Sequence, residues 1–564
     1  MNRRSLIQKM GFGLVGFPAL FKSSVPTTEG GSVLFYLPQS FGAKGDGKTL
    51  DSDAINTAID HAYEAGGGVV YVRSGTYLCG TVILKSRVTL YLEAGAILLG
   101  SKDVNQYTPQ HGPSATGDTG AKHLLFARDV EDVTIMGPGL IDGQGKSFWV
   151  PSDRKQVALE DRWQDVATLY WKPLPRVSPM IELANCRRLR IEDIRIENAS
   201  GWTMRLNNCS NVVVDGISIK NPVYGINVDG IDVTNCSDVR IANCSIDTAD
   251  DAICLKSEKA YGDSVPACRN ITVTNCTMSG CCNGFKFGTG TAGAFENITF
   301  SNSVIYNDDV DLNARIISGI CLEMVDGGSV EGVVIVGIRM QRTRTPIFLR
   351  LGNRTPRSNG QAGTLRCVTI SDILATGAVA TSSIVGIPGY DIEDVTLANV
   401  RIETMEETQA AWLSRTIPEQ IKSYPESRMF GRLPAWGLYC RHVNGLRLRD
   451  LSLSSPAPQA TPVLVCDDVK QVEISGLRAI CPSQSASSIE FQNVQGAWIR
   501  DTQAIAGSPS LLHASGSSST NVLITSCDLR GVHEAVTRSA DCPPTSIRAS
   551  FNIESQPSVG ASSP

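Results

Sequence analysis

Short runs of alternating apolar and polar residues recur along most of the chain. Phrases such as "CSNVVVDGISIKN", "CRNITVTNCTM" and "IEDVTLANVRI" are rich in Val and Ile and are separated by turn residues. They return at a spacing of about 20 to 30 residues, and such alternation is typical of β-strands. The pattern predicts no helices between the copies, so successive strands must pair by coiling. We therefore predict an all-β protein, a right-handed parallel β-helix, which is a solenoid.

Two segments depart from the repeat. "LDSDAINTAIDHAYEAGGG", residues 50–68, predicts an amphipathic helix with Asp51 or Ser52 as its N-cap and a glycine run at its end. Such a helix would cap the open N-terminal end of the solenoid, whose strand edges could otherwise pair with other chains. Residues 402–436 also break the pattern and predict a long loop insert or lid, because long loops in repeat proteins tend to carry binding functions.

The N-terminus carries the features of an export signal. "MNRRSLIQKMGFGLVGFPALFKSS" places cations before an apolar run of about a dozen residues, which suits a signal peptide and is too short to span a bilayer. "NRRSLIQK" also looks like a twin-arginine signal, and a Sec signal or a buried helix is the alternative. We expect residues 1–25 to be an export signal, residues 33–550 one β-helix domain and residues 551–564 a disordered tail. The expected location is the periplasm or the outside of a bacterial cell, with no membrane span.

Composition narrows the classes of ligand. A formal net charge of −5 argues against a nucleic-acid binder, because such proteins neutralise phosphates with clustered Lys and Arg. Several of the 17 cysteines follow Asn at one point of the repeat, as a small buried apolar residue would. No paired CxxC spacing suggests a zinc site, so we expect mostly free, buried thiols, and no metal or cofactor.

Three aspartates stand in a regular setting, in "NVDGID" and "ADDAICLKS". Asp229 and the pair Asp250 and Asp251 lie one predicted coil apart, on neighbouring rungs separated by about 4.8 Å. Three carboxylates that close cannot all ionise cheaply, so at least one pKa should rise. A protonated acid beside a carboxylate is what glycoside hydrolysis requires. The alternatives are turn residues, since Asp-Gly is a frequent turn dipeptide, or a calcium site.

Basic residues are expected beside these acids. Lys256, Lys286 and Arg315 alternate with apolar residues or stand next to them, so that they face outward on successive rungs. Each by itself can be a solvated surface cation. Together they suit an anionic sugar, because Lys and Arg pair with carboxylates.

At these residues the chain resembles the family 28 glycoside hydrolases, the polygalacturonase-like enzymes of pectin breakdown. The resemblance begins at "FGAKGDGKTLDSDAIN" and runs through "GLIDGQGKSFW" to about Arg354. It implies a right-handed parallel β-helix, inversion of the anomeric centre, a pectic substrate and no cofactor. "NVDGID" and "ADDAICLKS" correspond to family motifs that imply Asp250 as general acid, with Asp229 and Asp251 activating water. "ARII" corresponds to Arg-Ile-Lys and implies that Arg315 binds a substrate carboxylate.

The chain departs from the family pattern at two positions. "CCNGFKFGT" has Asn283 where the family usually has histidine, and Ile317 replaces the lysine of Arg-Ile-Lys. Lys286 or Lys256 can supply the missing cation. Later segments look like a bacterial branch of the family, which adds candidate substrate contacts; a packed Trp and turn-bonding arginines are the alternative. These candidates are Arg350, Arg354, Trp436, Arg441 and His442.

Three functions fit these observations. The first is an inverting glycosidase acting on a galacturonate-containing pectic polymer or oligosaccharide, with the insert closing one end of the groove and enforcing exo cleavage. The second is a pectate-lyase-like β-elimination, for which Lys256, Lys286 or Arg315 would be the base. The third is a non-catalytic, glycan-binding β-helix in which the acids are remnants.

Overall fold

The computed structural model describes residues 34–110, 121–152, 171–223, 225–259, 264–307 and 316–554. The predicted export signal, Arg315 and most of the predicted tail lie outside the described residues. The chain divides into Met1–Leu34 and a compact unit, Phe35–Pro564, and every described strand and helix belongs to the second unit. The division into signal, domain and tail stays a prediction.

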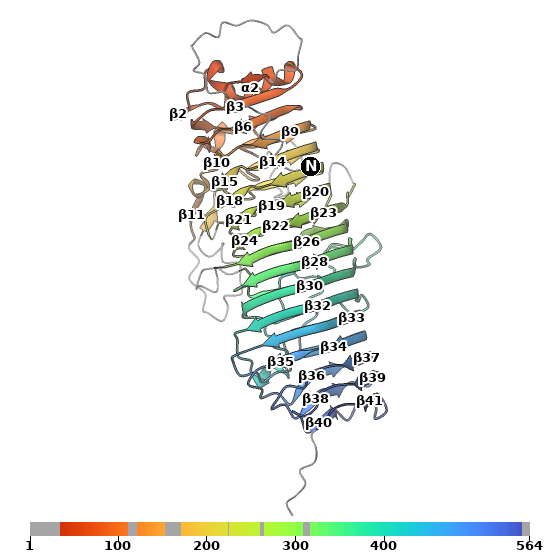
Figure 1. Cartoon of the computed structure of the whole chain (residues 1–564). Coiled ribbons are helices and arrows are strands. Elements are labelled where there is room, and N and C mark those ends of the chain that lie inside the picture. The colour runs from red at the N-terminus through yellow and green to blue at the C-terminus, as the bar shows by residue number, and fades with distance from the viewer. Residues whose placement is uncertain are drawn as a thin grey trace, which may run out of the picture. The chain divides into compact units, whose positions relative to one another are not determined.

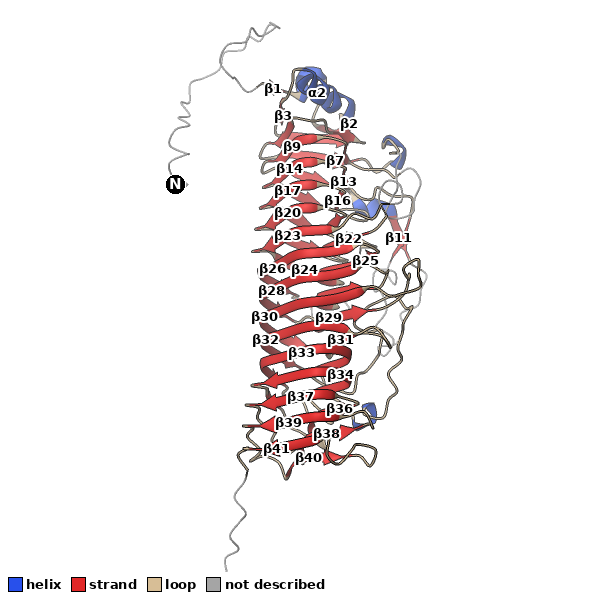
Figure 2. Ribbon diagram, turned by 90° about the vertical axis from the view of Figure 1, so that its right-hand side faces the viewer, coloured by secondary structure: helices blue, strands red, loops and turns tan. Residues whose placement is uncertain are grey.

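The compact unit is a stack of rungs built from three series of parallel strands, as Figures 1 and 2 show. The first series carries the candidate acids and is here called the site series. It consists of β5 (Val82–Ile83), β8 (Leu125–Arg128), β13 (Ile181–Ala184), β16 (Met204–Asn207), β19 (Ile231–Thr234), β22 (Ile253–Ser257), β25 (Asn283–Thr291), β27 (Ser318–Met324), β29 (Thr345–Leu351), β31 (Ser382–Val385), β33 (Leu438–Ser454), β34 (Leu464–Ser475), β36 (Ser487–Gln492), β38 (Ser510–Ser515) and β40 (Glu534–Arg538).

The second series follows the site series along each rung. It consists of β1 (Phe35–Tyr36), β3 (Gly68–Val72), β6 (Val88–Leu92), β9 (Glu131–Met136), β14 (Arg187–Glu192), β17 (Ser210–Asp215), β20 (Ser237–Ala242), β23 (Cys268–Thr274), β26 (Ala294–Tyr306), β28 (Ser329–Gln341), β30 (Thr364–Ala378), β32 (Ile392–Thr404), the later parts of β33 and β34, β37 (Gln495–Arg500), β39 (Thr520–Thr525) and β41 (Ile547–Ser550).

The third series completes the rungs and merges with the long strands from β26 onward. It consists of β2 (Asp46–Leu50), β4 (Gly75–Cys79), β7 (Ala96–Gly100), β10 (Leu140–Asp142), β15 (Arg195–Glu197), β18 (Ser218–Lys220), β21 (Ser245–Thr248), β24 (Thr277–Gly280) and β35 (Arg478–Ile480). A short antiparallel pair, β11 (Trp149–Pro151) with β12 (Trp171–Pro173), stands outside the stack. The predicted all-β parallel β-helix is confirmed.

The Asn-Cys phrase of the sequence has a structural reason. Asn208 and Asn235 each turn the chain in the left-handed conformation, with φ of 55° and 57°, which Asn tolerates better than most residues. The cysteine that follows points inward, and the Cys236 thiol donates to the Leu206 carbonyl oxygen at 3.3 Å. All 17 cysteines lie in the described part of the chain, all are free thiols, and most are buried, as the sequence predicts.

The N-terminal cap is the helix α2, Ser52–Glu64, and its buried face is the predicted one. Neither predicted N-cap side chain caps it. Asp51 occupies the N-cap position, but its carboxylate accepts hydrogen bonds from the Lys44 and Gly45 amides at 2.7 and 2.9 Å. Ser52 instead accepts from the Gly80 amide at 3.0 Å. The remaining helices of the described residues are the short 3₁₀ turns η1 (Pro38–Phe41), η2 (Val104–Gln106), η3 (Gly145–Phe148) and η6 (Ala410–Trp412).

The predicted insert is present as residues 405–437, between β32 and β33. It folds onto the outward surface of the site series through a small second hydrophobic core. Insert residues Ile417 and Phe430 pack in this core against Phe348, Tyr439 and Val465 of the strands. The insert therefore covers the rungs that follow the candidate acids. Within the described chain, the helices are too short or too polar to cross a bilayer.

Candidate active site

Asp229 and Asp251 occupy the same point of two successive rungs. Each lies two residues before its strand, β19 or β22, and these strands pair with Ile231 opposite Ile253. The Gly230 amide donates to the Asp251 carbonyl oxygen at 2.8 Å, which fixes the two turns against each other. Each aspartate is only 3% exposed. The fold thus holds both carboxylates side by side and away from bulk water.

Asp250 joins these two residues as the more exposed acid of the group. Its Oδ1 accepts a hydrogen bond from the Asp251 amide at 2.9 Å. One carboxylate oxygen of Asp250, one of Asp251 and Cys282 Sγ lie within 4.8 Å of one another. The structure therefore brings the three predicted aspartates into one cluster.

Asn283, at the position of the family histidine, lies one rung beyond Asp251. Its Nδ2 donates to Asp251 Oδ1 at 2.7 Å. Lys286 Nζ lies 3.1 Å from Asp251 Oδ2 and 3.7 Å from Glu323 Oε2, and all these side chains are buried. An amide and an ammonium group thus surround Asp251. Because Lys286 already balances its charge, Asp251 is poorly suited to a metal ion.

Lys256 forms the floor of the cluster on the other side. Its Nζ lies 3.4 Å from Asp232 Oδ1 and 4.9 Å from the centre of the Trp202 ring. It also donates to the Gly288 carbonyl oxygen at 3.3 Å. Both predicted lysines are therefore held against acids by the strands, and Trp202 adds a half-buried aromatic surface beside them.

The acids differ in pKa because their surroundings differ. Burial raises the pKa of Asp229 well above its ordinary value, and repulsion from Asp232, Asp250 and Asp251 adds to this. Burial also raises the pKa of Asp232 to about 7, although Lys256 opposes the rise. Burial acts in the same direction on Asp251, but Lys286, Lys256 and Asn283 outweigh it, so the pKa of Asp251 is lowered. Near neutral pH the cluster therefore holds at least one proton and one firmly ionised carboxylate.

Four residues that the sequence patterns did not single out belong to this site. Asp232 and Glu323 are fully buried acids that each lie beside one of the lysines, and burial raises the pKa of Glu323 to about 7. The alternation of the site strands could have identified them, since both take outward positions. Trp202 lies under Lys256, and Tyr424 of the insert lies with its ring centre 5.8 Å from Lys286 Nζ. No local pattern pointed to Tyr424, because it reaches the site from a distant segment.

Two predicted substrate contacts lie inside the protein instead. Arg350 is fully buried and donates to the carbonyl oxygens of Gly386 and Glu419 at 2.8 and 2.7 Å. Its guanidinium lies 5.2 Å from the centre of the Phe430 ring. Trp436 is 1% exposed and packs in the core. Arg350 thus ties the insert to the sheet, and neither side chain is open to a substrate in this structure.

The other candidates of the bacterial branch also have protein partners. Arg441 pairs with Glu419 and lies 3.1 Å from Asp467. His442 Nδ1 lies 2.7 Å from Asp468 Oδ2 and its Nε2 lies 3.2 Å from Glu419 Oε2. These contacts fasten the insert to β33 and β34. Arg354 pairs with Asp326 at 2.7 Å. It lies beside Tyr424, on the side of the insert that faces the acid cluster.

The family model described as "Glycosyl hydrolases family 28" matches residues 103–416, more than half of the chain. The chain belongs to glycoside hydrolase family 28. The predicted family and enzyme class, a glycosidase, are thereby confirmed. A second model, "Rhamnogalacturonase A/epimerase, pectate lyase-like", matches residues 39–146.

Relatives and solved structures agree with this family 28 assignment. The chain is 26% identical over 401 residues to "Probable polygalacturonase" of Vitis vinifera, covering 68% of this chain and 77% of that one. It is 26% identical over 336 residues to "Exo-poly-alpha-D-galacturonosidase" of Dickeya chrysanthemi, covering 52% and 53%. The exopolygalacturonase structure from Thermotoga maritima has a TM-score of 0.52 and 23% identity, covering 66% and 87%. The family 28 exopolygalacturonase of Yersinia enterocolitica has a TM-score of 0.53 and 18% identity, covering 83% and 78%.

The matched share of the relatives is uneven. The chain spans 77% of the grape relative, but about half of the Dickeya relative and 61% of "Polygalacturonase-2" of Solanum lycopersicum. The two solved structures share the β-helix fold with this chain.

Proposed function

We propose that this protein hydrolyses glycosidic bonds in a galacturonate-containing pectic polymer or oligosaccharide, with inversion of the anomeric centre. The observation that carries the proposal is the acid cluster. Asp229 and Asp251 stack on successive rungs, Asp250 stands beside them, and the environments separate the pKa values of the two buried acids. The lowered pKa of Asp251 suits the base role, because a base must be ionised to take a proton from water, and Asp250 is the more exposed acid beside it. The polygalacturonase names of several relatives favour the same substrate class.

In the proposed mechanism, Asp250 gives its proton to the glycosidic oxygen as the bond to the anomeric carbon breaks. A water molecule attacks the opposite face of the sugar and loses its proton to Asp251, which Lys286 and Asn283 keep ionised. Asp229 positions this water through its buried carboxyl group. Inverting enzymes usually hold the acid and base carboxyls about 6.5–9.5 Å apart. One oxygen of Asp250 lies within 4.8 Å of one oxygen of Asp251, so the anomeric form of the first product, followed by NMR, is the test of inversion. Proton exchange with solvent then restores Asp250 and Asp251.

The proposed mode of cleavage is exo. The insert packs on the outward surface of the site series from β27 to β34, directly beyond the rung of Lys286. Its Tyr424 ring lies 5.8 Å from Lys286 Nζ and 5.7 Å from Arg354. A polymer that crosses successive rungs would meet the insert as a barrier. The end of the polymer would therefore have to enter the site. The relatives include both an exo enzyme and an "Endo-polygalacturonase" of Pectobacterium carotovorum, so the insert carries this argument.

The first test compares wild type, Asp250→Asn and Asp132→Asn on polygalacturonate, rhamnogalacturonan and their oligosaccharides. Asp132 belongs to an exposed ion pair on the second strand series and serves as the matched control. We expect saturated sugars from wild type and the control, and a loss of roughly 100- to 10,000-fold in Asp250→Asn, the usual range for a general acid. Near-normal turnover by Asp250→Asn would contradict the assignment.

The products discriminate the remaining alternatives. Release of single sugar units supports exo cleavage, whereas a ladder of intermediate oligosaccharides contradicts it. Unsaturated products with ultraviolet absorbance, and sensitivity to a chelator, would indicate β-elimination. Binding without any product would favour the non-catalytic β-helix.

We also propose that the protein is exported, because of the cationic and apolar pattern of residues 1–25. Fractionation of producing cells, with N-terminal sequencing of the mature protein, tests this. Recovery of the uncleaved chain from the cytoplasm alone would contradict it.

A further inference from the structure

A second hollow lies on the other side of the insert from the acid cluster. It has a volume of about 460 Å³, within the usual range of small-ligand sites. Insert residues 413–417 form one wall, and the site strands β33, β34, β36 and β38 form the floor. The hollow, here called the insert pocket, therefore shares its sheet surface with the acids, but the insert separates the two.

The floor of the insert pocket offers polar groups on consecutive rungs. The strand register places Glu490 of β36 beside His513 of β38, and Asp467 of β34 beside Gln492 of β36. Arg441 and Asp467 form an ion pair at 3.1 Å, and the two His513 nitrogens contact Thr537 and Ser539 hydroxyls at 2.9 and 3.1 Å. These partners hold the pocket's polar surface in place without filling it.

Glu490 is the exception among these groups. In the described part of the chain, no hydrogen bond or ion pair reaches its half-buried carboxylate, and burial alone raises its pKa to about 7. A partly buried polar group without a partner is costly unless a ligand or water pairs with it. Exposed Gln492, two residues along the same strand, adds an amide beside it. The pocket thus offers acceptors and donors to a ligand.

The mixture of groups points to a hydroxyl-rich ring. A metal cation would meet Arg415, Arg441 and His513 in the same pocket, which disfavours it. A purely apolar ligand would leave Glu490 unpaired. A sugar has hydroxyls that can donate to Glu490 and accept from Gln492, while Leu413 and Pro434 offer apolar surface to its ring.

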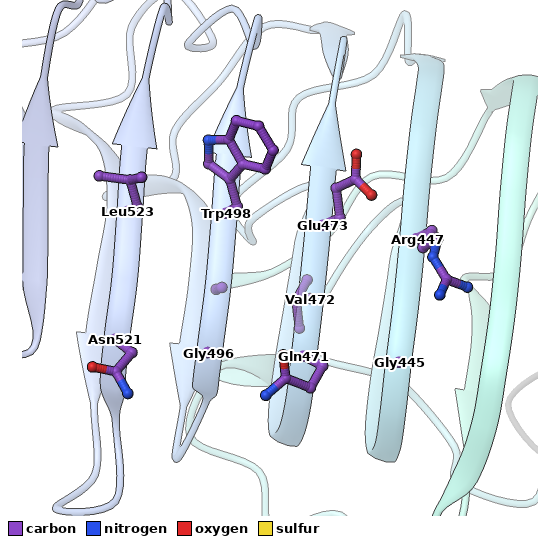
Figure 3. A pocket seen from close by; sticks show the side chains of 10 residues that line it. Gly445, Arg447, Gln471, Val472, Glu473, Gly496, Trp498, Asn521 and Leu523 are labelled. Carbon is purple, nitrogen blue, oxygen red and sulfur yellow. The ribbon is translucent and has the colours of Figure 1, made fainter.

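Another hollow, of about 510 Å³, lies on the second strand series around Trp498 (Figure 3). Its charged groups are already satisfied. Glu473 pairs with Arg449 and Arg500 at 3.0 Å each, and Arg500 lies 4.8 Å from the centre of the Trp498 ring. This hollow lacks the unpaired, half-buried acid that distinguishes the insert pocket, and it serves as the control.

We propose that the insert pocket is a second saccharide-binding site, in which the Glu490 carboxylate and the Gln492 amide bind sugar hydroxyls. The choice of a saccharide as the ligand class rests on the proposed function. The site would hold a sugar unit that the acid cluster does not cleave, and the insert would form a wall of both sites.

Calorimetry on the full chain tests this proposal. The Asp250→Asn variant, which should not cleave, is titrated with trigalacturonate and, separately, with a neutral galactan trisaccharide. We expect one of the two probes to occupy a site that is weakened tenfold or more by adding Glu490→Ala, as expected for lost hydrogen bonds to a charged group. Adding Trp498→Ala instead should leave this binding unchanged.

Two further measurements make the outcome decisive. Glu490→Gln keeps the size of the side chain, so its unfolding midpoint and its binding separate a folding defect from a binding defect. Binding of both probes that is unchanged by Glu490→Ala, or absent, overturns the second site. If wild type cleaves no pectic substrate but Glu490-dependent binding persists, the proposed function fails while the second site stands.

Discussion

The site series and the second strand series both carry ladders of opposite charges, yet the two ladders differ in burial. On the site series, Lys286 and Asp251 form a pair whose side chains are 3% and 4% exposed. On the second series, Arg188 and Asp132 form a comparable pair that is 45% and 44% exposed. The same rung geometry produces both pairs. Water screens the exposed pair and makes it nearly neutral for stability, whereas the buried pair shifts the pKa of its members and depends on its partner. The comparison shows that the fold supplies regular positions and that burial decides which of them can do chemistry.

Removing one member of the buried ladder should have the largest effect. In Lys286→Ala, Asp251 and Glu323 lose their shared cation and become buried, unpaired acids. We expect a loss of about 3–5 kcal/mol in unfolding free energy. Turnover should also fall, with the acid limb of the pH–rate profile moving to higher pH as the pKa of Asp251 rises. Urea unfolding and kcat/KM against pH measure these effects, and an unchanged acid limb would contradict the role given to Lys286.

The buried acids should also make stability depend on pH. Burial raises the pKa values of Asp232 and Glu323 to about 7 from ordinary values near 4, so the folded state binds more protons than the unfolded state between these pH values. The unfolding free energy should therefore fall by a few kcal/mol between about pH 4 and 7 and level off above that. Glu323→Gln should reduce this slope. Urea titrations at pH 5 and 8 measure it, and equal stability at both would contradict the prediction.

A smaller effect is expected where the insert meets the site. Tyr424 contacts Lys286 and Arg354 through its ring but is half exposed. Tyr424→Ala should raise KM several-fold with little change in stability, because the ring shapes the entrance without supporting the core. A matched change on the same insert, Ile421→Ala, removes another exposed side chain. Equal KM values for wild type and both variants would remove Tyr424 from the site.

The smallest effect should come from the exposed ladder. Arg188→Ala removes the partner of Asp132 and Glu131 on the second series. The unfolding midpoint and kcat/KM should stay within experimental error, because water already solvates these groups. A loss as large as that of Lys286→Ala would mean that burial does not distinguish the two ladders.

Most of the fold was predictable because it rests on local patterns. The period of the strands, the left-handed Asn before a buried Cys and the amphipathic face of α2 each follow from a few neighbouring residues. Asp51 occupies the predicted N-cap position, but its carboxylate binds the Lys44 and Gly45 amides instead of a helix amide. A side chain at an N-cap does not bond the helix amides when a neighbouring loop offers it better-placed donors.

The candidate site was predictable in its acids and not in its supports. The spacing of Asp229 from Asp251 matches the length of one rung, which brings the two residues side by side on neighbouring rungs. The places of Lys256 and Lys286 at the site were predictable from the outward alternation of their strands. The burial of Arg350 and Trp436 was not predictable, because it depends on where the insert folds.

The sequence by itself determined the rungs and the row of acids, since strand period and turn chemistry act over a single coil. Only the tertiary structure decided which acid holds a proton, which arginine is buried and how the insert divides the sheet surface. Those outcomes depend on desolvation and on contacts between residues such as Arg350 and Glu419, which are far apart along the chain.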